Sequence, residues 1–490
     1  MSVRSFLPGM AAAVCVAMCV APGCGGGGTG FGTDGSVNGD SSSSKDSNGP
    51  MFPDVSAETG PTCTGLECQV ASCGGNPAET TVSGIVFDPA GRNPLYNVYV
   101  YVPNAPLAPI TTGAVCTACQ APASGSPLPG AMQTDALGHF SITQVPSGNN
   151  IPLVMQAGKF RKQIIIPTVT PCVDNAIGAK DSNNLETITR LPRTQNEGNN
   201  NVDNLPLIAM ASGGCDSLEC LLRMIGIADS EFSVAGRVHL FQGSGGASGS
   251  GDGTNTNAYE FWGNGSGAEL LKHDIVINSC ECSPNARDTD GPAYANMENY
   301  LNGGGRLFGT HYHYNWFASP TGPTDFQQTA KWLTDNPIAE APYYINTTIP
   351  KGVALNSWIQ NVWKAAPPPN GQIELVYSNE DASQVNDTAP YSTTPWIYYG
   401  NSSLTSNAYG TSYLSFNTPI TATTQCGRAV FSDLHVAPPV GSGAFPAECP
   451  SGNPLTTPMN EQETALEFLF FDLSSCVSND NMPPPPPPVN

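Results

Sequence analysis

Apolar and polar residues alternate along several short stretches between residues 80 and 170, and turn-forming residues such as Asp88-Pro89-Ala90-Gly91 separate these stretches. A period of two with frequent turns predicts β-strands that bury one face. Strands spaced this closely predict an all-β sandwich, which we place at residues 62–170. We expect its strands at residues 81–87, 97–102, 151–156 and 162–166, and a strand–turn–strand at residues 132–142.

A different pattern begins at Leu205, where short apolar runs alternate with stretches that have helical spacing of apolar residues. Alternating strands and helices predict a mainly parallel sheet with helices on both faces. The region from 311 to 428 is aromatic-rich and weakly regular, which indicates long insertions. We expect strands at 205–211, 234–241, 274–278, 306–310 and 429–432, and helices at 216–225 (with Asp216 as N-cap), 293–301 and 461–473.

The N-terminus has the pattern of an export signal. Arg4 precedes a short apolar run that ends in small residues before Cys24, as in secretory signal peptides. The run is too short to span a bilayer as a permanent helix. It resembles a bacterial lipoprotein signal, so we predict a signal peptide at residues 1–24 with Cys24 as the lipidated residue.

Composition predicts the remaining segments. Residues 25–61 are rich in Gly, Ser, Asp and Asn and have few large apolar side chains, which predicts a disordered tether. Residues 171–204 are polar and Asn-rich and are predicted to link the sandwich to an α/β domain at 205–476. Residues 477–490 form a Pro-rich tail, which favours an extended conformation.

The cysteine content fits an exported protein. The chain has sixteen cysteines, and disulfides are typical of compartments outside the cytosol. We expect a lipid-anchored protein of the outer membrane or cell surface; a periplasmic or secreted protein is the alternative. Seven cysteines lie between Cys215 and Cys476, so one stays unpaired unless a bridge crosses between domains. The disulfides we expect are Cys116–Cys119, Cys215–Cys282 and Cys426–Cys476.

Charge and motifs exclude several function classes. Forty acidic and eighteen basic residues give a net charge of −22, so no basic stripe is present to bind nucleic acid. The sequence has no GxSxG, HExxH or phosphate-binding loop motif. These absences argue against the common serine hydrolases, zinc proteases and nucleotide hydrolases.

Two stretches of the predicted sandwich resemble a known family. They are SGIVFDPAGRNPLYNVYVYVP at residues 83–103 and TDALGHFSITQVPSG at residues 134–148. They resemble the carboxypeptidase regulatory-like domain over about 90 residues. The resemblance implies a transthyretin-type (prealbumin-like) sandwich that presents ligands or serves as structure, without catalytic residues.

The C-terminal region resembles the ThuA-like and class I glutamine amidotransferase-like group. The motifs are DIVINSCE, YLNGGGRLFGTH, CGRAVFSDLHV and ETALEFLFFDL, which cover about 120 of 270 residues. The resemblance implies a flavodoxin-like α/β fold. An amidotransferase would have its nucleophilic cysteine after the 307–310 strand, where this chain has His311, so that activity is disfavoured. The whole chain resembles uncharacterised cysteine-rich bacterial lipoproteins.

Candidate chemistry gathers where the predicted parallel strands end, since ligands bind beyond the carboxyl ends of such strands. His311, His313 and His435 are candidate ligands for a divalent metal such as zinc. His311 and His313 are expected as strand neighbours that face one side. The candidate catalytic residues are His311, His313, Asp433, His435 and Glu281, with one histidine and a carboxylate as an acid–base pair. The same residues are also common as helix caps and loop supports.

Two functions are therefore expected. The first is a non-enzymatic surface protein that binds a glycan or another envelope ligand and meets the membrane through its lipid anchor. The alternative is a sugar-processing or hydrolytic enzyme with a histidine-based site in the α/β domain. No cofactor is predicted beyond a possible divalent metal.

Overall fold

The computed structural model describes residues 63–485 except 76–78, 117–122, 199–200, 264–266, 285–290, 334–340, 364–366, 377–378, 401, 403, 405–408 and 437–442. The predicted signal peptide, its lipidated Cys24, the tether and Cys119 lie outside the described residues. None of the described helices is long and apolar enough to cross a membrane.

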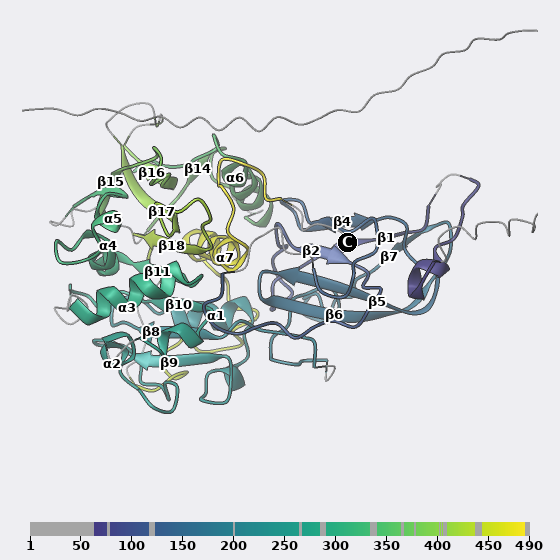
Figure 1. The fold of residues 1–490 in the computed structure, drawn as a ribbon, viewed down its shortest axis with the longest axis horizontal. Coiled ribbons are helices and arrows are strands. Elements are labelled where there is room, and N and C mark those ends of the chain that lie inside the picture. The colour runs from purple at the N-terminus through teal and green to yellow at the C-terminus, as the bar shows by residue number, and fades with distance from the viewer. Residues whose placement is uncertain are drawn as a thin grey trace, which may run out of the picture. The chain divides into compact units, whose positions relative to one another are not determined.

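Residues 63–204 form the N-terminal β region, which has two sheets (Figure 1). All their strand pairs are antiparallel except the parallel pair of β1 and β7. Val82 and Phe140 from one sheet and Val100 and Leu153 from the other are buried in a common core. One sheet has the order β4 (His139–Ile142), β1 (Thr81–Ile85), β7 (Asp174–Ala176), and the other β3 (Met132–Gln133), β2 (Tyr99–Tyr101), β5 (Gly148–Ala157), β6 (Phe160–Val169).

The segment predicted as a linker belongs to this β region. Strand β7 lies within residues 171–204 and pairs with β1 in parallel. Leu191 is fully buried in the same core, so the segment packs along the β region before the α/β region begins. The polar residues of β7 take part in this pairing, since the carboxylate of Asp174 accepts hydrogen bonds from the hydroxyls of Thr81 and Ser83.

Residues 205–485 form the C-terminal α/β region around a nine-stranded sheet (Figure 1). The five strands from β18 to β9 are parallel, and the other four are antiparallel. β12 (Ala330–Trp332) and β15 (Ala382–Val385) pair separately. The sheet order is β14 (Gln372–Ile373), β13 (Tyr343–Ile345), β16 (Thr394–Tyr399), β17 (Gly410–Thr418), β18 (Gly427–Ser432), β11 (Arg306–Thr310), β10 (Ile275–Asn278), β8 (Ile208–Ser212), β9 (Val238–Gln242).

Helices cover both faces of this sheet, because its central strands are apolar on both sides. Ile277 and Phe308 face one core with helices α1, α6 and α7, whereas Val276 and Leu307 face a second core with α2 and α3. The helices are α1 (Leu218–Ile225), α2 (Ala258–Gly263), α3 (Gly291–Asn302), α4 (Asn315–Ala318), α5 (Thr324–Gln327), α6 (Pro350–Val362) and α7 (Glu461–Ser474), with 3-10 turns at Gly65–Gln69, Asp229–Glu231, Leu270–Lys272 and His311–Tyr314.

The cores of the two regions are continuous. Phe160 of the β region packs against Phe470 and Phe471 of α7, with ring centroids 6.1 and 5.5 Å apart. The indole Nε1 of Trp358 donates a hydrogen bond to the carbonyl of Pro94 across the same boundary, at 2.6 Å. Helix α7 therefore buries apolar surface against both regions.

The disulfides differ in part from those expected. Cys116 bonds Cys426, across 310 residues of sequence, so both the Cys116–Cys119 and the Cys426–Cys476 pairings are wrong. Cys476 is also disulfide-bonded. Sequence spacing favoured local pairs, but the loop with Cys116 lies against the α/β region. The other bridges among the described residues are Cys63–Cys68, Cys73–Cys172, Cys215–Cys282 and Cys220–Cys449.

Two buried carboxyl groups meet where α7 packs on the β region. Asp88 and Glu467 are each 0% exposed and hydrogen-bond to one another. Asn93 Nδ2 donates to Glu467 Oε2 at 2.6 Å. Burial raises the pKa of both carboxyl groups, and that of Glu467 rises well above its ordinary 4.5. The pair therefore shares a proton in the folded protein.

We predict that Glu467→Gln flattens the pH dependence of stability. A raised pKa in the folded state means that stability is fully present below the ordinary pKa and is lost as pH rises. The amide keeps the shape and donates to Asp88 without a proton, so the variant should be about 1–3 kcal/mol more stable than the parent at pH 8. Thermal unfolding from pH 4 to pH 8 measures this difference. The exposed Glu260→Gln is the control, and equal curves for Glu467→Gln and the parent would contradict the shared proton.

Candidate metal centre

The carboxyl ends of β8, β10, β11 and β18 bring four chain segments to one edge of the sheet. Cys280 follows β10, and His311 follows β11 at a sharp turn with φ of 43°, in the left-handed region. A non-glycine residue there stores backbone strain, which is common at functional positions. The turn places His311 Nδ1 3.2 Å from Cys280 Sγ.

His435 completes a three-residue cluster. Its ring lies edge-on to that of His311, with centroids 4.8 Å apart. One ligand atom each from Cys280, His311 and His435 lies within 4.8 Å of the others. Cys280 is 0% exposed and both histidines are 6% exposed. This Cys–His–His cluster is therefore both close and buried.

Carboxylates surround the cluster. Asp381 Oδ2 lies 3.6 Å from His311 Nε2, and Asp216 Oδ2 lies 3.6 Å from His435 Nδ1. Asp433 Oδ2 accepts a hydrogen bond from the backbone N–H of Asp381 at 2.9 Å. The side chains of Asp381 and Asp433 hydrogen-bond to one another, and Asp216 hydrogen-bonds to the side chain of Thr310. Three buried carboxyl groups therefore gather beside the two histidines, and such a group is an environment that a cation would stabilise.

Burial holds these groups in their uncharged forms. It raises the pKa of Asp216 and of Asp381 to about 7 and that of the Cys280 thiol to about 12. The pKa of Asp433 rises well above its usual range for the same reason, aided by the neighbouring Asp381. Burial lowers the pKa of His435 to about 3. A bound metal ion reverses this preference, because it favours the thiolate and the carboxylates.

The structure separates the remaining candidates from this cluster. The predicted strand alternation of His311 and His313 is wrong, because β11 ends at Thr310 and a 3-10 turn follows. His313 Nε2 contacts the carbonyl of Ser279 at 2.9 Å, and Trp316 Nε1 donates to His313 Nδ1. Both ring nitrogens of His313 are thus occupied. Glu281 Oε2 accepts a short hydrogen bond from the hydroxyl of Tyr259.

Asp216 was predicted as a helix N-cap, and that role is wrong. Ser217 is the N-cap of α1, and Asp216 Oδ1 accepts from the backbone N–H of Val436 at 2.8 Å. Asp216 therefore ties the segment with His435 to the end of β8. Two residues of the site, Asp381 and Cys280, are not among the candidates predicted from the sequence; the long insertion brings Asp381 to the site. The odd number of cysteines between Cys215 and Cys476 was the signal in the sequence that one cysteine of this region could stay reduced.

The insertion covers the cluster. Asn379 Nδ2 donates to His435 Nε2 at 3.0 Å, and Asp381 stands directly before β15. Cys280 is the free cysteine among the described residues. A second grouping, Cys220, Glu448 and Cys449, does not suit a metal because its cysteines form a disulfide. The site is convergent but closed.

No protein-family model matches this chain, and no curated protein matches it. The two family resemblances noted in the sequence therefore stay predictions.

We predict that the Cys280 thiol resists alkylation in the native protein. It is 0% exposed, so the reagent cannot reach the sulfur in the folded protein. Iodoacetamide with peptide mass spectrometry should label Cys280 after denaturation in the presence of a chelator, and Cys280→Ser should abolish that label. Fast labelling of the native protein would contradict the closed site.

Proposed function

We propose that this protein is an exported, lipid-anchored envelope protein whose α/β region binds a divalent transition metal ion, with zinc as the expected metal. The ligands are Cys280, His311 and His435. One observation carries the proposal: three ligand atoms within 4.8 Å of one another lie beside the buried carboxyl groups of Asp216 and Asp381.

The donor set suits zinc. One thiolate and two imidazoles are borderline-soft ligands that zinc accepts in tetrahedral sites, with a carboxylate oxygen as a common fourth ligand. Two carboxylates are close enough to supply that oxygen: Asp381, which lies beside His311, and Asp216, which lies beside His435. The other carboxylate would then accept from an imidazole N–H and orient the ring, as carboxylates next to metal-bound histidines do.

A non-catalytic role fits the closure of the site. Catalytic zinc keeps one coordination position open to water and substrate. Here the described residues bury the cysteine fully and leave each histidine 6% exposed. The alternative, a sugar-processing or hydrolytic enzyme, is supported by the contacts of Cys280 with His311 and of His311 with Asp381, which resemble a nucleophile, a base and an orienting acid.

Export and anchoring stay part of the proposal. Five disulfides among the described residues suit an oxidising compartment. In such a compartment a cysteine that stays reduced needs protection, and metal ligation of Cys280 would provide it. The prealbumin-like and flavodoxin-like folds implied by the two resemblances belong to the same proposal. In it, the β region is a spacer between the lipid anchor and the α/β region.

We expect the mature protein, purified from the periplasm or envelope, to contain about one zinc ion per chain by elemental mass spectrometry. Cys280→Ser and His435→Ala should each lower this content at least about tenfold. Substitution of residues that only hydrogen-bond to metal ligands already lowers metal affinity by about 10–100-fold. His139→Ala is the matched control because His139 is an exposed residue of β4, and it should keep the parent's metal content.

Cobalt substitution provides a second readout. Cobalt bound through Cys280 should give a thiolate-to-metal charge-transfer band that Cys280→Ser removes and His139→Ala keeps. A metal-free parent with normal folding, or metal content unchanged in both ligand variants, would refute the metal centre. Hydrolysis of a glycoside by the parent that His311→Ala abolishes would instead support the enzyme alternative.

A further inference from the structure

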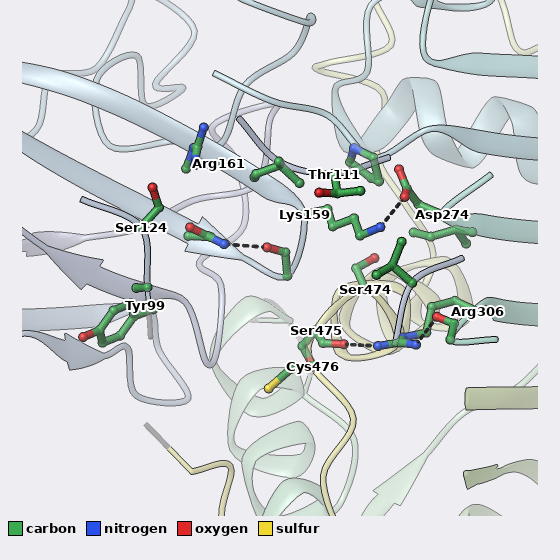
Figure 2. A pocket seen from close by; sticks show the side chains of 18 of the residues that line it. Tyr99, Thr111, Ser124, Lys159, Arg161, Asp274, Arg306, Ser474, Ser475 and Cys476 are labelled. Carbon is green, nitrogen blue, oxygen red and sulfur yellow. Dashed lines mark hydrogen bonds and ion pairs between the residues drawn. The ribbon is translucent and has the colours of Figure 1, made fainter. Parts of the chain in front are cut away.

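A cavity of about 370 Å³ lies at the other edge of the large sheet, where β10 and β11 begin. Lys159, in the turn between β5 and β6, faces Asp274 and Arg306, which stand at the starts of β10 and β11 (Figure 2). Ser474 and Ser475, at the end of α7, also line the cavity. This site shares no residue with the metal centre.

The cavity is positively charged in an acidic protein. Lys159, Arg161 and Arg306 line it, and Asp274 is the one carboxylate among the described lining residues. The chain as a whole has 40 acidic and 18 basic residues. A local excess of cations against such a background attracts anionic ligands.

Asp274 is already fully used. Its Oδ1 accepts from Lys159 Nζ at 2.5 Å and from the backbone N–H of Gly113 at 2.7 Å. Its Oδ2 accepts from the backbone N–H of Leu207 and lies 3.7 Å from Arg237. The single carboxylate is therefore engaged by Lys159, by two backbone N–H groups and by the nearby Arg237, while three cations line the cavity.

Donors remain for a ligand. The guanidinium of Arg306 donates from Nη1 to the carbonyls of Gly304 and Cys426, whereas its Nη2 makes only a 3.4 Å contact with the carbonyl of Ser475. Nη2 is therefore the donor of Arg306 that remains for an anion. Lys159 Nζ makes two hydrogen bonds, to Gly113 and Asp274, of the three that an ammonium offers. Burial lowers the pKa of Arg306 to about 10.

The rest of the wall suits a sugar ring. Thr111, Ser124 and Gln133 supply hydroxyl and amide groups, and the ring of Tyr99, which packs on Tyr101, adds apolar surface at one side. Polar groups beside an aromatic ring are the usual elements of a small-molecule site, and the volume lies at the lower end of the range for such sites.

We propose that this cavity binds a sugar acid of monosaccharide size, with its carboxylate held by Arg306 and Lys159 and its hydroxyl groups beside Thr111 and Ser124. The carboxylate matches the excess of cations, and the hydroxyls match the amide and hydroxyl side chains. The proposal goes beyond the metal centre and does not depend on it.

Isothermal titration of the purified mature protein with D-glucuronate tests the proposal, with methyl glucoside and inorganic phosphate as comparison probes. Glucuronate should bind at least about tenfold more tightly than methyl glucoside, the worth of one charged hydrogen bond. Lys159→Met should weaken glucuronate binding about tenfold or more. Lys272→Met removes an exposed charge elsewhere and should leave binding within about twofold.

A second variant separates binding from folding. Thr111 is exposed at the cavity wall, so Thr111→Trp fills the cavity without disturbing the core; it should abolish glucuronate binding and keep the parent's melting temperature. Cys280→Ser should keep glucuronate binding, which distinguishes this site from the metal centre. Equal affinity for glucuronate and methyl glucoside, tighter binding of phosphate, or unchanged affinity in Lys159→Met would each overturn the proposal.

Discussion

Burial of helix α7 is the constraint on which the rest of the structure depends. Thirteen of its residues are buried, because the large sheet covers one side and the β region covers another through Phe160. A helix enclosed in this way must satisfy its polar side chains internally, which explains the proton shared by Asp88 and Glu467. The helix also spans both sites: Gln462 near its start donates to the carbonyl of His435, and Ser474 at its end lines the cavity.

The cluster around His311 illustrates how burial decides between chemical roles. Contacts between a thiol, an imidazole and a carboxyl group are compatible with either catalysis or metal binding. Catalysis needs a substrate to reach the thiol, whereas metal ligation needs a shell of donors that excludes water. Asn379 and Asp381 lie over the cluster from the insertion. This enclosure is the reason why we propose metal binding and not catalysis for the cluster.

Sequence pattern predicted the strands and helices of the central α/β region well, since their apolar runs are long and regular. It missed the four antiparallel strands because Tyr343–Ile345 and Thr394–Tyr399 lie in an aromatic stretch without clear periodicity. At the site, His311 and His435 each follow a predicted parallel strand, so the predicted topology placed both histidines at the same edge of the sheet. The position of Asp381 depends on how the insertion folds back, and the separation of His313 depends on one left-handed residue. The local pattern of apolar residues predicts neither the position of Asp381 nor the separation of His313. The Cys116–Cys426 bridge could not be predicted from it either, because the bridge depends on tertiary contact.

The Cys116–Cys426 bridge also bears on how the molecule reaches its final state. Its two cysteines are 310 positions apart, and the second lies close to the end of the chain. If the protein crosses the membrane from its N-terminus, Cys116 emerges long before its partner and meets other thiols first, among them Cys172 and Cys215. Correct pairing then depends on a disulfide isomerase, or on early docking of the β region, to keep Cys116 available until Cys426 has emerged.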